Sequence, residues 1–114
     1  MNLHVSRLFV LAAALISFSI TSQAAEISAV DVWIDVRSPE EHREANISGH
    51  SNITHTQIAD KIATLVSDKD TPVYLYCASG RRAGIAKEAL EHMGYTNVTN
   101  AGGIDEVRKQ LSTR

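Results

Sequence analysis

The chain has 114 residues, of which 44% are hydrophobic and 21% are charged, with a formal net charge of −2 at pH 7. This length suits one domain, and the near balance of charge gives no basic surface for nucleic acid or anionic lipid, so we predict neither as a partner. Because Cys77 is the only cysteine, no disulfide can form within the chain.

The first 24 residues have the pattern of a cleaved secretory signal peptide. Residues 1–9 carry Arg7 and no acidic residue, and residues 8–20 are almost wholly apolar. Small residues then occupy the two positions before the expected cleavage site, Ser22 and Ala24, that a signal peptidase recognises. A membrane anchor is the alternative, but the apolar run is shorter than the roughly 20 residues that span a bilayer. We predict cleavage after Ala24, a periplasmic protein without a membrane anchor, and one mature domain of residues 25–114.

Residues 30–36 alternate apolar and polar side chains, which predicts a first strand. Ser38 and Pro39 then have the types preferred at a helix start, and this short helix is expected to end by Asn46. Asp35 and Arg37 stand at the end of the strand, where both ligand sites and buried ion pairs occur. We favour the interpretation that the two side chains pair and fix the turn.

Two more elements lead to the cysteine. Residues 56–67 place apolar side chains on one face, which predicts an amphipathic helix. Residues 73–76 are apolar on both alternating faces, as in a central strand of a parallel sheet that is covered on each side. His42, His50 and His55 lack the spacing of metal ligands, so no metal site is predicted.

Residues 82–93 predict a helix that ends before Gly94. Its expected buried stripe consists of Ile85, Ala86, Ala89, Leu90 and Met93. Residues 97–100 predict a short last strand, residues 101–103 a turn, and the apolar positions from Ile104 onward a closing helix.

Strands and helices therefore alternate along the chain. This order predicts an α/β fold with a central parallel sheet that is flanked by helices on both faces, and a site at the carboxyl ends of the strands. Cys77 lies at such an end.

The loop Cys77-Ala78-Ser79-Gly80-Arg81-Arg82 is the candidate site. Unpaired N–H groups at a helix start and the helix dipole favour a thiolate there. Gly80 lets the loop curl its amides around the sulfur, and the two arginines add positive charge. An inert buried cysteine is the alternative, but a free thiol in an exported protein is a liability unless it has a chemical use.

Such a thiolate could attack either an electrophilic sulfur of an anionic donor or a phosphorus. The loop of a cysteine phosphatase would place an arginine six positions after the cysteine, where this chain has Ala83. The cradle is one residue shorter, and a smaller ring suits a single terminal sulfur better than a tetrahedral phosphate.

Several motifs together resemble the single-domain rhodaneses. They are Asp35-Val36-Arg37 with Glu41, the turn around Ile47-Ser48-Gly49, the loop Cys77-Ala78-Ser79-Gly80-Arg81, the helix Ala86-Lys87-Glu88, and Met93-Gly94-Tyr95 leading to Asn100-Ala101-Gly102-Gly103. They cover nearly the whole mature chain in the family's order.

The resemblance implies a small rhodanese-like domain that transfers sulfur from thiosulfate to cyanide or another thiophilic acceptor, with no cofactor. Cys77 would be the nucleophile and persulfide carrier. The amides of Ala78, Ser79, Gly80, Arg81 and Arg82 would cradle the persulfide, and an arginine would attract the oxygens of thiosulfate. Neighbouring helix residues diverge by about 100°, so only one guanidinium should point into the loop, and the resemblance favours Arg81.

Two other functions stay open from the sequence. One is a non-catalytic rhodanese-like module that binds sulfur or a protein partner. The other is a phosphatase or an arsenate-type reductase that uses the same thiolate, which Ala83 disfavours.

Overall fold

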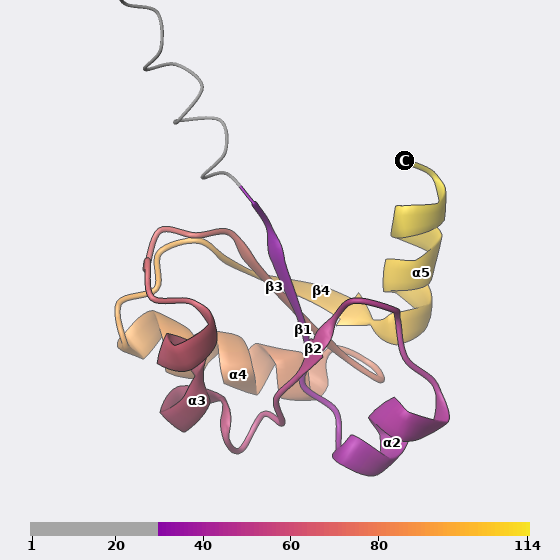
Figure 1. Cartoon of the computed structure of the whole chain (residues 1–114), viewed down its shortest axis with the longest axis horizontal. Coiled ribbons are helices and arrows are strands. Elements are labelled where there is room, and N and C mark those ends of the chain that lie inside the picture. Colours follow the sequence, from indigo (N-terminus) through magenta and orange to yellow (C-terminus); the bar gives the residue numbers. More distant parts are fainter. Residues whose placement is uncertain (1–29) are drawn as a thin grey trace, which may run out of the picture.

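The computed structural model describes residues 30–114. The predicted signal peptide and its cleavage site lie outside these residues. Four strands alternate with four helices: β1 Val32–Asp35, α2 Pro39–Glu44, β2 Ser51–Asn52, α3 Ile58–Leu65, β3 Val73–Cys77, α4 Arg81–His92, β4 Val98–Gly103 and α5 Ile104–Ser112 (Figure 1). Among the described helices none combines the length and apolar character that crossing a membrane requires.

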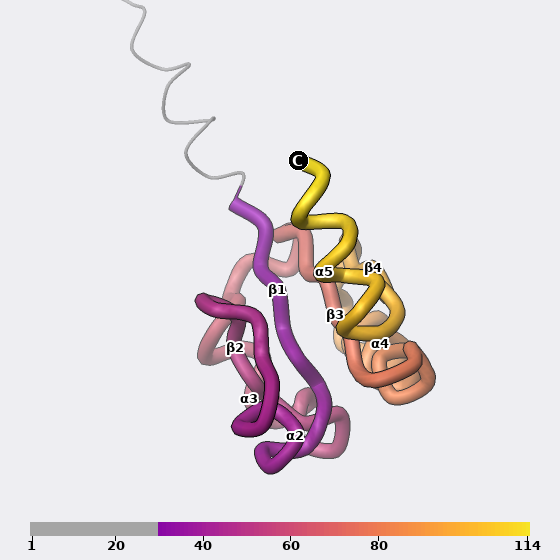
Figure 2. The backbone as a smooth tube through the Cα atoms, turned by 90° about the vertical axis from the view of Figure 1, so that its right-hand side faces the viewer, coloured from indigo at the N-terminus to yellow at the C-terminus, as the bar shows by residue number. Residues whose placement is uncertain are grey.

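All four strands are parallel and form one sheet in the order β2-β1-β3-β4, which the tube in Figure 2 shows across the molecule. Helices α3 and α4 cover one face, and α5 packs on the other against β3 and β4. The predicted α/β fold with helices on both faces is confirmed. Since β3 lies in the middle of the sheet, its carboxyl end is surrounded by neighbouring elements.

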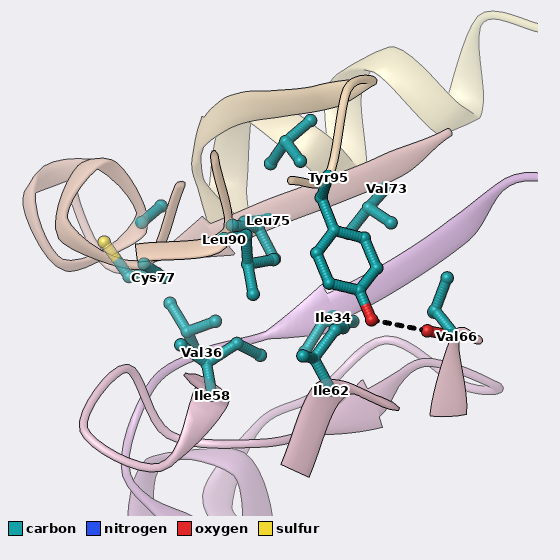
Figure 3. Packing of buried hydrophobic residues seen from close by; sticks show 13 residues of the cluster. Ile34, Val36, Ile58, Ile62, Val66, Val73, Leu75, Cys77, Leu90 and Tyr95 are labelled. Carbon is teal, nitrogen blue, oxygen red and sulfur yellow. Dashed lines mark hydrogen bonds between the residues drawn. The ribbon is translucent and has the colours of Figure 1, made fainter. Parts of the chain in front are cut away.

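Because side chains alternate along β3, the strand contributes residues to two hydrophobic clusters. Leu75 and Cys77 point into the larger cluster, with Ile34 of β1 and Leu90 of α4. Figure 3 shows Cys77 at one end of this cluster, far from the bond between the Tyr95 hydroxyl and the Val66 carbonyl, 2.7 Å, at the other. The alternate residue Tyr76 packs under α5 with Ile104 and Val107. Cys77 is therefore part of the hydrophobic core, while its sulfur faces the loop.

Some predicted boundaries were wrong. Helix α3 spans only Ile58–Leu65 rather than residues 56–67, because Gln57 takes the cap position. Helix α4 begins one residue earlier than predicted, at Arg81. Strand β4 continues through Gly103, where a turn was predicted, because Gly103 pairs with Cys77 of β3.

The predicted stripe of α4 was wrong at Ile85, whose side chain is 45% exposed. The fully buried positions are Ala83, Ala86 and Leu90, which follow the spacing of one helix face. Ala89 and Met93 are partly buried beside them, as predicted. Ile85 is rotated away from this face and lies on the side of α4 that faces water.

Candidate active site

The cysteine loop connects the end of β3 directly to α4. Cys77 is the last residue of β3, and Gly80 is the N-cap of α4. Gly80 has φ of +96°, a left-handed conformation that side chains other than that of glycine rarely adopt. This turn brings the Gly80 N–H to 2.9 Å from the Cys77 Sγ. The predicted role of Gly80 in curling the loop around the sulfur is therefore confirmed.

Backbone N–H groups favour the thiolate form of Cys77. The thiol is only 1% exposed, and this burial raises its pKa. Hydrogen bonds from the N–H groups of Ala83, Ser79, Gly80 and Arg82 outweigh burial, so the pKa of Cys77 lies below that of an ordinary thiol. The backbone N–H groups thus favour the thiolate even though the Cys77 side chain belongs to the hydrophobic core.

The set of donors differs from the prediction. The amides of residues 78–82 were expected to form the cradle, but the N–H groups bonded to the sulfur are those of Ser79, Gly80, Arg82 and Ala83, without Ala78 and Arg81. Because α4 begins at Arg81, Arg82 and Ala83 occupy the second and third helical positions, whose N–H groups have no partner within the helix. The first helical bond is made by Gly84, whose N–H donates to the Gly80 carbonyl at 3.0 Å. The cradle is therefore partly loop and partly helix N-terminus.

The arginine beside the sulfur is Arg82, and the preference for Arg81 was wrong. Hydrogen bonds to Glu41 raise the pKa of Arg82, and its interactions with Cys77 raise it further. Arg81 is exposed and forms no ion pair within residues 30–114. The side chain of Arg82 turns toward α2 and the sulfur, while that of Arg81 extends into water.

Glu41 of α2 holds Arg82 in place. Its Oε1 accepts from Arg82 Nη1 at 2.7 Å and its Oε2 from Nη2 at 3.0 Å. The Arg82 bonds lower the pKa of Glu41 to about 2. Ser38 at the N-cap orients the same carboxylate, because its backbone N–H and its hydroxyl donate to Glu41 Oε1 at 3.1 and 3.0 Å. In the sequence, Glu41 stood out only as part of a family motif. Its role at the loop depends on its contact with Arg82, which lies 41 positions away.

Asp35 and Arg37 pair with each other, as predicted. Arg37 donates to the Asp35 carboxylate through Nη2 at 2.8 Å and Nε at 3.0 Å, and its Nη2 also donates to the Ala45 carbonyl. Burial raises the pKa of Asp35, but the bonds from Arg37 and from His42 outweigh it and hold the pKa below its usual value. The pair is buried and fixes the turn after β1.

The three histidines do not form a metal site. His42 contacts Asp35, whereas His50 Nδ1 lies 2.8 Å from the Tyr76 hydroxyl and its ring stacks on Trp33. Residues 30–114 contain no cluster of three or more histidine, cysteine or acidic side chains that could hold a metal.

The end of β4 lies directly against the loop. A Cβ at Gly103 would lie 2.4 Å from the Ala78 carbonyl oxygen, and a Cβ at Gly80 would lie 3.3 Å from the Gly102 Cα. The backbones approach this closely only because glycines stand at both points. The glycine pair noted in the sequence therefore shapes the wall of the site.

Comparisons with known proteins agree with this geometry. Residues 20–110 match the Rhodanese-like domain family. The chain is 45% identical over 81 residues to the thiosulfate sulfurtransferase PspE of Escherichia coli, covering 71% of this chain and 78% of that protein. The predicted resemblance to the single-domain rhodaneses is thereby confirmed.

Solved structures show the same fold. A rhodanese with anions from E. coli superposes with a TM-score of 0.65 at 45% identity, over 68% of this chain and 91% of that one. A human single-domain sulfurtransferase gives a TM-score of 0.60 at 25% identity, over 78% of this chain and 88% of that one. With its parallel sheet, its cysteine loop and these relatives, the chain belongs to the rhodanese-like domain family.

Proposed function

We propose that the chain is a thiosulfate sulfurtransferase that carries sulfur as a persulfide on Cys77. The observation that carries this proposal is the ring of backbone N–H groups around the Cys77 sulfur. The similarity to PspE, whose name gives the same activity, supports it. Hydrogen-bond donors stabilise a sulfur anion, and this loop offers several.

The reaction has two steps. In the first, the Cys77 thiolate attacks the outer sulfur of thiosulfate, a new S–S bond forms, the bond to the inner sulfur breaks, and sulfite leaves with the electron pair. In the second, cyanide or another sulfur-accepting nucleophile attacks the outer sulfur of the persulfide. The S–S bond breaks, the sulfur leaves on the acceptor, as thiocyanate when the acceptor is cyanide, and the thiolate returns. Charge balances in both steps without an external oxidant.

Loop groups have separate tasks in this cycle. The N–H groups of Ser79, Gly80, Arg82 and the adjoining Ala83 stabilise the negative sulfur before and after transfer. Arg82, held by Glu41, keeps a fixed positive charge beside the sulfur. The exposed guanidinium of Arg81 attracts the doubly charged donor.

A phosphatase or arsenate-type reductase fits the geometry less well. The position six residues after the cysteine is Ala83, a fully buried residue that offers a backbone N–H and no guanidinium. An arginine at that position would stabilise the negative charge of a transferring phosphoryl group, and this chain has none there.

We also propose that residues 1–24 direct export and that the mature domain of residues 25–114 works in the periplasm. The charged start, the apolar run and the small residues before Ala25 support this. The substrates would be small: thiosulfate as donor, and cyanide or a thiol as acceptor.

Steady-state sulfur transfer tests the proposed function. Purified protein is supplied with thiosulfate and cyanide, and thiocyanate is measured. We expect turnover by the unchanged chain and none by Cys77→Ser, which keeps the shape of the side chain but loses the thiolate. Equal rates for the two proteins would contradict the proposal. Tight capture of a partner protein without turnover would favour the non-catalytic module.

A further inference from the structure

Asn100 of β4 connects the end of its strand to the cysteine loop. Its Nδ2 donates to the Gly80 carbonyl at 2.9 Å, and its Oδ1 accepts from the Gly102 N–H at 2.9 Å. The two bonds define the orientation of the amide, because only the NH2 end can donate to a carbonyl and only the oxygen can accept from an N–H. Both ends of the side chain are therefore occupied in holding backbone.

Gly80 is the residue where this connection meets the chemistry. Its carbonyl accepts from Asn100, and its N–H donates to the Cys77 Sγ at 2.9 Å. Glycine has more backbone freedom than any other residue, so a glycine that must present its N–H at a fixed point needs a restraint. The Gly84 N–H restrains the same carbonyl from the helix side. Asn100 restrains it from the sheet side.

We propose that Asn100 is a positioning residue that holds the Gly80 N–H on the reacting sulfur of Cys77. Asn100 acts through Gly80 and is bonded to it rather than to the sulfur. The claim that Asn100 matters for sulfur transfer rests on the proposed function. The claim that Asn100 affects the ionisation of the Cys77 thiol rests on the contacts alone. The neighbouring glycines complete the support, because Gly102 and Gly103 let the strand end contact the loop backbone directly.

The test compares Asn100→Ala and Asn100→Thr with the control Thr99→Ala. Thr99 is the adjacent exposed residue of β4, and its side chain makes no hydrogen bond to residues 30–114. The rate of Cys77 alkylation by iodoacetamide is measured from pH 5 to pH 10, with folding checked by circular dichroism. This reagent is uncharged, so the rate reports the thiolate fraction and does not depend on any sulfur donor.

We expect both Asn100 variants to raise the apparent pKa of Cys77 by about one unit, so alkylation below the two pKa values slows by about tenfold. Thr99→Ala should match the unchanged chain. In thiosulfate-to-cyanide transfer, the Asn100 variants should be slow at low pH and approach the unchanged chain at high pH, where the thiol is ionised in every protein. A residue that only stabilised the fold would not give this convergence.

An unshifted Cys77 pKa in the folded variants would overturn the proposal, and so would an equal loss of transfer at every pH. Because Asn100 is exposed on an edge strand, both variants are expected to fold. Loss of the fold in both would also overturn it, by making Asn100 a stability residue. A raised pKa in variants of a chain that transfers no sulfur would uphold the role of Asn100 and contradict the proposed function.

Discussion

Two polar groups lie at the carboxyl edge of the same sheet, one at the end of β1 and one at the end of β3, and they behave differently. After β1, Asp35 is fully buried and its carboxylate is occupied by Arg37 and His42. At the end of β3, several N–H groups converge on the Cys77 sulfur and lower its pKa. A buried ion pair whose groups are all occupied stabilises the fold, whereas hydrogen-bond donors that converge on one reactive atom form a site.

The largest effect on stability is expected from breaking the buried Asp35–Arg37 pair. Asp35→Ala leaves the Arg37 guanidinium, 6% exposed, without its buried partner, which costs about 3–5 kcal/mol. Urea unfolding measures this loss, with Asp31→Ala, an exposed acid just before β1, as the control. The folded fraction should keep the alkylation rate of the unchanged chain. A loss of less than about 1 kcal/mol would contradict the role given to this pair.

A smaller loss is expected where the strand end supports the loop. Gly103→Ala places a Cβ 2.4 Å from the Ala78 carbonyl oxygen, so backbone must shift, at a cost of about 1–3 kcal/mol. Gly84→Ala is the matched control, because its Cβ would meet only the Asn100 amide at 3.5 Å. Within a helix this change should stabilise by about 0.5–1 kcal/mol. Thermal unfolding of the two variants should therefore shift in opposite directions; equal shifts would refute the close approach.

The two arginines of the loop are expected to have different roles in the kinetics of sulfur transfer. Arg81→Ala removes an exposed charge without an ion pair in the described part of the chain, so KM for thiosulfate should rise about two- to tenfold at low ionic strength, and salt should erase the difference. Arg108→Ala, on α5, serves as the control. The pKa of Cys77 should stay nearly unchanged in Arg81→Ala. A large rise of that pKa would show that Arg81 and not Arg82 serves the sulfur.

The smallest effect concerns Glu41 and is visible in acid. Its pKa of about 2 lies below the usual 4.5, so the folded state binds this proton less readily than the unfolded state. The Glu41–Arg82 pair therefore contributes stability above pH 4.5 that is lost as pH falls toward 2. Because both side chains are partly exposed, we expect under about 1 kcal/mol.

Glu41→Gln should remove this part of the pH dependence, measured by urea unfolding at pH 5 and pH 3. Glu40→Gln, which changes the neighbouring exposed acid, is the control. If the two variants have the same pH dependence, the Glu41–Arg82 pair does not make this contribution.

Local patterns in the sequence were sufficient for much of this account. The apolar run of β3, the amphipathic α4 and the cysteine between them predicted an α/β sheet with its site at a strand end. The wrong preference for Arg81, and the missed roles of Glu41 and Asn100, have one cause. The bond from Arg82 to Glu41 spans 41 positions and that from Asn100 to Gly80 spans 20, so neither leaves a periodic or spaced pattern. The Ala83 N–H was missed because the cradle depends on where α4 begins, and helix boundaries are the least certain part of such a prediction.

Intact mass spectrometry tests the central claim most directly. The purified chain is measured alone, after thiosulfate, and after later addition of cyanide, beside Cys77→Ala. We predict a mass gain of one sulfur atom with thiosulfate, its loss with cyanide, and no gain in the variant. The absence of an adduct on the unchanged chain, or the same adduct on Cys77→Ala, would contradict a persulfide carried by the cysteine at the end of β3.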